Sequence, residues 1–332
     1  MEYVKLGKSG LDVSRFCLGC MNYYQSAAGR KLRPWAFNEE DGRAFIKAAL
    51  ERGVNFFDVA NVYSDGECES VVGGALRDFA RRDEVVIATK VGLQAFPGPN
   101  GAGLSRKAVF SELDKSLKRL GTDHVDLYII HRFDYTTELE ESLEALNDLV
   151  RSGRVLYLGA SSMHAWRLMK ALGIQRARGW APFVSMQNYY NMLYREEERE
   201  MLPMCASEGV AVTPWSPLAR GRLARPWSDD PQTDRAKVDG EVSQRLFGKS
   251  EHLDKPVVDR LMEVAAARKD PPAQIALAWM YRKPGIVAPV VGASTLRHID
   301  DAVAALSLAL SDEEMRLLEE PYQPHPATEA FA

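Results

Sequence analysis

The chain has 332 residues, 46% of them hydrophobic, which is enough to bury one large core or two modest ones. Its net charge of -4 excludes the basic surface typical of nucleic-acid binding, and no run of 18 apolar residues predicts a membrane span. The first residues lack the apolar stretch of a signal peptide. We therefore expect a cytoplasmic protein with neither nucleic-acid nor membrane partners.

A β-hairpin is predicted first, with strands at 3–6 and 11–13 around a turn from Gly7 to Gly10. Short apolar strands then alternate with amphipathic helices. We expect strands at 15–20, 54–58, 84–90, 125–131, 155–160, 182–187, 210–215 and 286–292. We expect helices at 38–52, 66–81, 105–120, 138–152, 163–176, 195–208, 256–269 and 295–306, with extra helices at 272–283 and 311–320.

Eight strand–helix units in about 300 residues predict an α/β fold, the (β/α)8 TIM barrel. An open doubly wound sheet with a second domain is the competing layout, but it requires a Gly-x-Gly-x-x-Gly turn after an early strand. The chain has no such turn, and no linker rich in Pro, Gly or Ser divides it. We therefore predict a single barrel domain over residues 1–332, with the hairpin and the extra C-terminal helices attached.

Cys17 and Cys20 form a Cys-x-x-Cys pair, which is compatible with a redox or zinc site. Both fall in the first predicted barrel strand, where residues three apart face opposite sides. We therefore expect buried, reduced cysteines. The six histidines are scattered, and no convincing metal-ligand spacing appears.

Four polar residues follow the ends of three successive apolar strands. Asp58, Lys90 and His131 each end such a strand, and Tyr63 lies in the loop after Asp58. Because the carboxyl ends of barrel strands meet at one face, these side chains are expected to gather there. A structural Asp–Lys pair is the alternative, but three consecutive polar strand ends favour catalysis.

This set of side chains suits proton transfer to a carbonyl oxygen. A phenol has a pKa near 10, and the Lys90 ammonium is expected to lower the pKa of Tyr63. Asp58 holds Lys90 charged and in place, and His131 donates a hydrogen bond that orients the carbonyl oxygen. Tyr63 then protonates that oxygen, or accepts the alcohol proton in the reverse direction.

Two loops after predicted strands are longer than usual, from Asn22 to Phe37 and from Ser216 to Lys255. Long loops at this face of a barrel commonly build the active site. The second loop is also compatible with a disordered surface insertion. We alternatively expect it to become ordered when a cofactor binds.

Beyond this chemistry, the sequence resembles the aldo-keto reductase family over nearly its whole length. The resemblance rests on Phe57-Asp58-Val59-Ala60-Asn61-Val62-Tyr63, Ile87-Ala88-Thr89-Lys90-Val91, Asp126-Leu127-Tyr128-Ile129-Ile130-His131, Leu158-Gly159-Ala160-Ser161-Ser162 and Pro214-Trp215-Ser216-Pro217-Leu218. It looks most like bacterial members with an Arg-rich segment after the seventh strand, here Ala219-Arg220-Gly221-Arg222-Leu223. The family is a (β/α)8 barrel that binds a nicotinamide dinucleotide without a Rossmann fold.

The resemblance implies that Asp58, Tyr63, Lys90 and His131 are the catalytic tetrad. It also implies cofactor contacts along the barrel mouth: Ser161, Ser162 and Gln187 for the carboxamide, and Trp215 for stacking on the nicotinamide ring. The implied pyrophosphate contacts are Ser216, Pro217, Leu218, Ala219, Arg220, Gly221 and Arg225. The implied contacts of the adenosine half are Gly292, Ser294 and the last barrel helix. Cys20, Met21 and Asp58 complete the implied set.

The last barrel helix departs from the family pattern at His298, which puts the adenine contacts in question. Arg297 is placed to pair with a 2′-phosphate, so NADP(H) is favoured and NAD stays possible. Asp301 either contacts adenine or is a solvated helix residue.

The substrate pocket is expected at the loops after the first four strands. Its candidates are Tyr23, Tyr24, Trp35, Phe96, Arg132 and Phe133. An aromatic wall suits an apolar or aromatic aldehyde or ketone, whereas Arg132 suits a carboxylate or phosphate. The same tetrad also serves physiological oxidation of a sugar or secondary alcohol, and a cofactor-sensing binding subunit is a third, less favoured reading.

Overall fold

The computed structural model describes residues 1–24, 35–228, 240–248 and 250–326. The predicted hairpin is present, with β1 (Tyr3–Lys5) paired antiparallel to β2 (Asp12–Ser14). Eight parallel strands follow in the sheet order β10-β3-β4-β5-β6-β7-β8-β9. Their bounds are β3 (Cys17–Gly19), β4 (Phe56–Asp58), β5 (Val86–Val91), β6 (Val125–Ile130), β7 (Val155–Ser161), β8 (Phe183–Gln187), β9 (Ala211–Val212) and β10 (Val290–Gly292).

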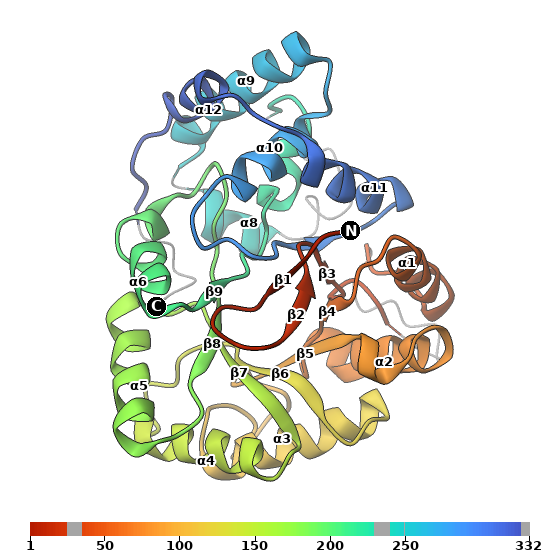
Figure 1. Cartoon of the computed structure of the whole chain (residues 1–332), viewed down its shortest axis with the longest axis vertical. Coiled ribbons are helices and arrows are strands. Elements are labelled where there is room, and N and C mark those ends of the chain that lie inside the picture. Colours follow the sequence, from red (N-terminus) through yellow and green to blue (C-terminus); the bar gives the residue numbers. More distant parts are fainter. Residues whose placement is uncertain (25–34, 229–239, 249, 327–332) are drawn as a thin grey trace.

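Backbone hydrogen bonds between the segments that contain β9 and β10 close the sheet into a barrel. The Val287 amide donates to the Val212 carbonyl over 2.9 Å, and the Val290 amide donates to Pro214 over 2.8 Å. Because β10 also pairs with β3, the eight strands form the closed (β/α)8 barrel expected from the sequence, with helices outside it (Figure 1). The last two barrel strands are shorter than predicted, and isolated bridges continue their pairing.

The predicted helices are present in the expected order, and α8 (Gly240–Phe247) is an additional helix within the segment 216–255 that was expected to be a loop. The helices are α1 (Glu39–Glu51), α2 (Glu67–Phe79), α3 (Arg106–Leu120), α4 (Leu139–Arg151), α5 (Ala165–Arg178), α6 (Met201–Glu208), α8, α9 (Glu251–Arg268), α10 (Pro272–Tyr281), α11 (Leu296–Ala304) and α12 (Asp312–Glu319). Side-chain caps at Asn38, Ser105 and Ser311 begin three of them, and left-handed glycines end others. None of the helices in the described ranges is long and apolar enough to cross a bilayer.

Two helix predictions were wrong in detail. The helix expected at 195–208 is broken into a short 3-10 turn, η3 (Glu196–Glu198), and α6. A continuous helix would place the Pro203 ring against the carbonyl of Arg199, whereas in the first turn of α6 the missing proline N–H costs nothing. The helix expected at 256–269 begins earlier, at Glu251, because the Ser250 carbonyl accepts from the amides of Leu253 and Asp254.

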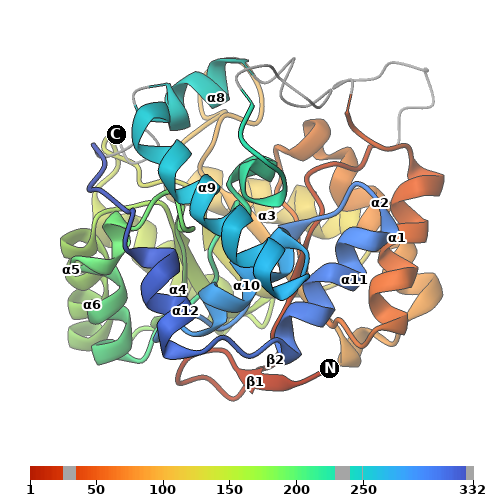
Figure 2. The same cartoon turned by 90° about the horizontal axis from the view of Figure 1, so that it is seen from above.

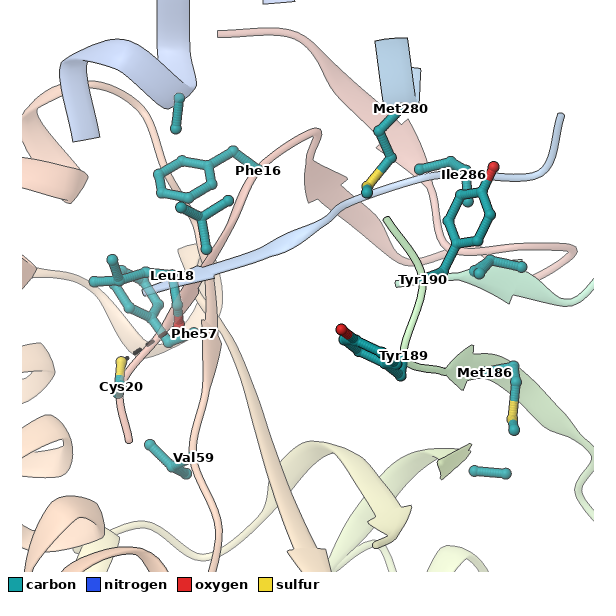
Figure 3. Close-up of a cluster of buried hydrophobic side chains, with 14 of the residues drawn as sticks. Phe16, Leu18, Cys20, Phe57, Val59, Met186, Tyr189, Tyr190, Met280 and Ile286 are labelled. Atoms are coloured by element: carbon teal, nitrogen blue, oxygen red, sulfur yellow. Dashed lines mark hydrogen bonds between the residues drawn. The ribbon is translucent and has the colours of Figure 1, made fainter. Parts of the chain in front are cut away.

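The barrel strands bury both faces. Residues that point into the barrel, including Cys17, Phe56, Ala88, Leu127 and Ile129, form one apolar cluster, and the alternate residues pack outward against the helices. Figure 3 shows part of the outer cluster, with Phe16, Leu18 and Cys20 near β3 and Phe57 and Val59 from the neighbouring chain segment. Cys17 and Cys20 thus lie on opposite faces of their strand, as expected.

The hairpin closes the amino-terminal end of the barrel. Leu6 and Val13 join the interior cluster, and the Lys8 amide donates to the Gly209 carbonyl over 2.9 Å. Gly7 has φ +63°, and a Cβ there would lie only 2.6 Å from the Gly209 carbonyl oxygen, so this turn requires glycine. The hairpin and α8 lie at opposite ends of the molecule (Figure 2), so α8 marks the end where the strands' carboxyl termini open.

Candidate functional site

Strand alternation places the predicted polar residues in one inward layer. Phe56, Ala88 and Ile129 belong to the apolar interior. Two residues further on, Asp58 and Lys90 are the next inward positions of β4 and β5, and His131 directly follows β6. Ser161 and Gln187 end β7 and β8 and are also buried. The barrel therefore changes from apolar to polar within one layer, at the end opposite the hairpin.

The Lys90 ammonium is the centre of this layer. Its Nζ donates to Asp58 Oδ2 over 2.6 Å, to the Val59 carbonyl over 2.8 Å and to the Tyr63 phenolic oxygen over 3.2 Å. The Lys90 and Asp58 side chains are 0% and 3% exposed. Because all three ammonium donors are used, Lys90 is fixed in position and the Tyr63 O–H is free to donate elsewhere.

The Lys90 pair is held from a second side. Gln187 Nε2 donates to Asp58 Oδ1 over 2.9 Å, so both carboxylate oxygens of Asp58 are occupied. Burial lowers the pKa of Lys90, but the Asp58 charge and the contacts with Tyr63 outweigh it and raise the pKa above its usual value. Lys90 is therefore a permanent cation at neutral pH.

Lys90 does not lower the pKa of Tyr63 overall, as the sequence led us to expect. Burial raises the pKa of the phenol, and the charge and hydrogen bond of Lys90 oppose this without overcoming it. Desolvation disfavours the phenolate more strongly than the ammonium stabilises it. Tyr63 is consequently protonated at neutral pH, which is the form that a proton donor requires.

His131 faces Tyr63, with the ring centroids 5.8 Å apart and the planes nearly perpendicular. Burial, followed by the charges of Lys90 and Arg132, holds the pKa of His131 well below its usual value. The imidazole is therefore neutral. Its Nδ1 is buried without a hydrogen-bond partner among the described residues. No internal hydrogen bond at Nδ1 therefore holds this ring.

Backbone strain is concentrated in the loops beside this layer. Six non-glycine residues have positive φ values in loops that follow β4, β7 and β9: Ser64, Asp65, Ser162, Ser216, Ala219 and Arg220. Each such conformation costs roughly 1–3 kcal/mol and persists only where the surroundings enforce it. These tight loops hold Tyr63 and Trp215 close to the barrel mouth.

The neighbouring wall contains the residues assigned to a nicotinamide ring. Trp215 Nε1 donates to Ser162 Oγ over 3.1 Å, and the Ser161 and Ser162 hydroxyls lie 3.1 Å apart. One face of Trp215 packs on Tyr189, with a centroid distance of 4.7 Å. Trp215 is therefore a supported, half-buried aromatic platform rather than a core residue.

Asn188 was not among the residues predicted from the sequence. The signal that could have found it is the pair of consecutive amide residues, Gln187 and Asn188, at the end of β8. Asn188 Oδ1 accepts from the Ser162 amide over 3.2 Å, and the Asn188 carbonyl accepts from the Trp215 amide over 2.9 Å. Its Nδ2 donates to the Glu197 carboxyl. Asn188 thus ties the β7 and β9 loops together beneath the Trp215 platform.

The residues assigned to the adenosine half and its phosphates meet at the start of α11. His298 Nδ1 accepts from the Ser294 amide over 3.2 Å, and the charges of Arg297 and Arg225 both act on His298. The Arg297 side chain is 77% exposed and lies 3.7 Å from Asp301. Gly292 is exposed at the end of β10, which leaves its backbone accessible at the mouth.

Two residues of the implied cofactor set are engaged elsewhere. Cys20 is fully buried, its amide donates to Asp58 and its carbonyl accepts from Tyr23, so it has no free group for a ligand. Asp301 accepts from Gln274 over 2.7 Å, so it is part of the helix packing and not merely solvated. The structure places Met21 in the loop after β3, Ser216, Pro217 and Leu218 in the loop after β9, and Ala219, Arg220 and Gly221 in the 3-10 turn η4 (Ala219–Ala224) that follows.

The predicted aromatic wall is largely wrong. Tyr23 is 0% exposed and stacks on Phe45 of α1, so its ring lies in the helix layer and not in a pocket. Phe96 is an exposed residue with Lys115 over its ring, and Phe133 packs against Tyr135 and the Arg167 guanidinium. Tyr24 and Trp35 are half-buried, on either side of segment 25–34, which lies outside the described residues.

Arg132, another of the proposed pocket residues, contacts the tetrad residue His131. Its Nη1 donates to the His131 carbonyl over 2.7 Å, and its guanidinium lies 5.9 Å from the centroid of the Trp215 ring. The four cysteines are free thiols. No cluster of three potential metal ligands occurs within the described ranges.

We predict that Glu197, beneath Asn188, makes stability depend on pH. Burial raises the pKa of Glu197 to about 8, partly offset by the Asn188 hydrogen bond. The folded protein therefore binds more protons than the unfolded chain between about pH 4.3 and the folded-state pKa, and stability falls as pH rises through this window. Replacing Glu197→Gln removes the effect.

The free energy of unfolding should fall by a few kcal/mol more in wild type than in Glu197→Gln between mildly acidic and alkaline pH. Urea unfolding across that range measures it. Glu200→Gln changes an exposed carboxyl one helical turn away and is the matched control. Parallel pH profiles for wild type and Glu197→Gln would show that Glu197 ionises normally.

Comparison with known proteins agrees with this geometry. Residues 15–323 match the model of the Aldo/keto reductase family. Versiconal hemiacetal acetate reductase of Aspergillus parasiticus is 42% identical over 98% of both chains. A putative aryl-alcohol dehydrogenase of Schizosaccharomyces pombe is 40% identical over 98% of this chain and 96% of the relative. Another, of Saccharomyces cerevisiae, is 36% identical over 98% of both chains.

These three relatives are fungal, so the expected likeness to bacterial members is not supported. The family match covers the barrel and all four residues of the tetrad layer. The chain belongs to the aldo/keto reductase family and is an oxidoreductase that interconverts carbonyl compounds and alcohols.

Proposed function

We propose that the protein is an NADP(H)-dependent reductase of aldehydes or ketones in which Tyr63 is the general acid. The observation that carries the proposal is the Lys90–Tyr63 contact of 3.2 Å, made by an ammonium that Asp58 holds at 2.6 Å. Lys90 donates to the phenolic oxygen, so the phenol proton points to a different acceptor. A substrate carbonyl oxygen at the barrel mouth is that acceptor.

The residues at the mouth fit a nicotinamide cofactor. Trp215 offers a supported aromatic face, Ser162 and Gln187 offer polar groups beside it, and Arg225 and Arg297 offer positive charge near Ser294. When bound, the cofactor supplies hydride to the carbonyl carbon. Arg297 is exposed and only loosely paired with Asp301, which favours a 2′-phosphate and hence NADP(H) over NAD(H).

Side chains of the protein orient the carbonyl group and transfer the proton. Neutral His131 donates a hydrogen bond to the carbonyl oxygen and orients it toward Tyr63. Tyr63 transfers its proton to that oxygen as negative charge develops there, and the fixed Lys90 charge stabilises the phenolate that remains. Asp58 and Gln187 keep Lys90 in place throughout.

Physiological oxidation of an alcohol uses the same groups in reverse. It requires the Tyr63 phenolate, which burial disfavours in the free protein. The raised pKa of Tyr63 thus favours reduction at neutral pH, with oxidation growing as pH rises. Since two fungal relatives carry the name aryl-alcohol dehydrogenase, aromatic carbonyl compounds are the first substrates to test.

Replacing Tyr63→Phe is expected to reduce kcat for an aromatic aldehyde by at least about 100-fold, since it removes the general acid. NADPH binding should change little, because within the described ranges the Tyr63 hydroxyl makes no hydrogen bond to a residue assigned to the cofactor. Steady-state turnover and tryptophan-fluorescence titration measure the two quantities. Tyr3→Phe, at an exposed hairpin position, is the control, and undiminished turnover in Tyr63→Phe would refute the role of Tyr63.

The cofactor preference has its own test. Wild type should bind NADPH more tightly than NADH, and Arg297→Met should weaken NADPH binding about 5- to 10-fold while leaving NADH binding nearly unchanged. Quenching of tryptophan fluorescence reports both affinities. Arg316→Met, which removes an exposed helical arginine, is the matched control. Equal affinities for the two cofactors in wild type would contradict the assignment of the 2′-phosphate to Arg297.

A further inference from the structure

One cation beside the tetrad has no counter-charge among the residues that the structure describes. The Arg132 guanidinium is half-buried. It donates to the carbonyl of its own neighbour, His131, and lies over the face of Trp215. No ion pair of Arg132 occurs within the described part of the chain. Desolvating a guanidinium without an acid partner is costly unless a ligand supplies the charge.

The nearest acid in the sequence is used for another purpose. Asp134 Oδ1 accepts from the Thr136 amide and hydroxyl over 2.8 and 2.7 Å. Its Oδ2 accepts from the Leu104 amide and the Thr137 hydroxyl, both over 2.7 Å. Asp134 thus organises the loop after β6, and both of its oxygens are engaged in these hydrogen bonds.

The cations assigned to the cofactor phosphates form a different group. Arg225 and Arg297 act on His298 at the start of α11, after β10, whereas Arg132 follows β6. In the barrel order β10-β3-β4-β5-β6-β7-β8-β9, four steps along the sheet separate β10 from β6. The phosphate end therefore already has its positive charges, and Arg132 is available to a second anion.

The surroundings of Arg132 locate that anion near the reacting carbonyl. Its electrostatic partners are Tyr63, one of the four tetrad residues, and Arg245 of α8, which adds a second positive charge at the mouth. Arg245 is exposed and has no ion pair among the residues described. Arg132 therefore lies within electrostatic range of Tyr63, and a second cation lies within range of Arg132.

We propose that Arg132 binds an anionic group of the substrate, so that the preferred substrates are carbonyl compounds that also carry a carboxylate. This inference rests on the proposed reductase function and names its substrate class. The planar guanidinium matches the two oxygens of a carboxylate, and the adjoining Trp215 ring suits a flat or apolar substrate body. Hydride and proton transfer are unchanged, because the carboxylate takes no part in bond making.

The test uses the intact protein with NADPH and a matched pair of substrates, 4-carboxybenzaldehyde and its neutral methyl ester. Wild type should have the higher kcat/KM for the acid. In Arg132→Met, the acid-to-ester ratio of kcat/KM should fall about 10- to 100-fold, mainly through KM for the acid. Arg132→Lys, which keeps the charge but not the fork, should restore part of the ratio.

The acid-to-ester ratio of kcat/KM reports carboxylate binding by Arg132 alone, because any effect of Arg132 on Tyr63 acts equally on both substrates. Arg178→Met, in the last turn of α5 at the opposite end of the barrel, controls for the loss of one positive charge. An unchanged ratio in Arg132→Met overturns the inference, as does a ratio near one in wild type. A tenfold loss of NADPH affinity with an unchanged ratio would assign Arg132 to the cofactor instead.

Failure of this inference is distinguishable from failure of the proposed function. Turnover of the neutral ester that is abolished in Tyr63→Phe supports the reductase whether or not the acid is preferred. No turnover of either substrate, with NADPH bound, contradicts both.

Discussion

The buried ion pair between Asp58 and Lys90 is the interaction on which the site depends. Both side chains are almost completely removed from solvent, and their Nζ–Oδ2 distance is 2.6 Å. Removing one partner of such a pair costs roughly 3–5 kcal/mol because the other charge is left uncompensated. The barrel satisfies the rest of the pair with Gln187, which donates to Asp58, and with the Val59 carbonyl and the Tyr63 oxygen, which accept from the ammonium. The position of Tyr63 follows from this arrangement.

Two opposing effects then decide which proton-transfer role suits Tyr63. The Lys90 charge stabilises the phenolate, and burial destabilises it; in the free protein burial prevails and the pKa of Tyr63 is raised. A protonated phenol whose oxygen already accepts from Lys90 is ready to donate its proton to a carbonyl oxygen. His131, neutral because burial and two nearby cations lower its pKa, completes the polar layer without adding charge. Arg132, immediately after it, carries the charge that a substrate carboxylate can use.

Much of this was predictable from the sequence, because strand alternation is a local pattern. Phe56 and Asp58, or Ala88 and Lys90, share a face whenever the strand forms, so the convergence of the tetrad followed from the order of the elements. The burial of Tyr23 was not predictable from the sequence. Whether an aromatic loop residue lines a pocket or packs into the helix layer depends on the position of the neighbouring helix, here α1. The balance of burial against charge at Tyr63 also depends on three-dimensional enclosure. Asn188 and Glu197 act through a fold-back of η3 onto β8 that no spacing rule indicates.

The most direct test of this account is the ionisation of Tyr63 itself. The phenolate absorbance of wild type minus that of Tyr63→Phe, followed as pH rises, isolates one tyrosine from the other eleven. Our account predicts that Tyr63 in the free protein ionises above its ordinary pKa of about 10, and that Lys90→Met moves the transition higher still. Ionisation of Tyr63 in wild type below about pH 8 would show that Lys90 outweighs burial, and would contradict the assignment of Tyr63 as a phenol poised to donate its proton.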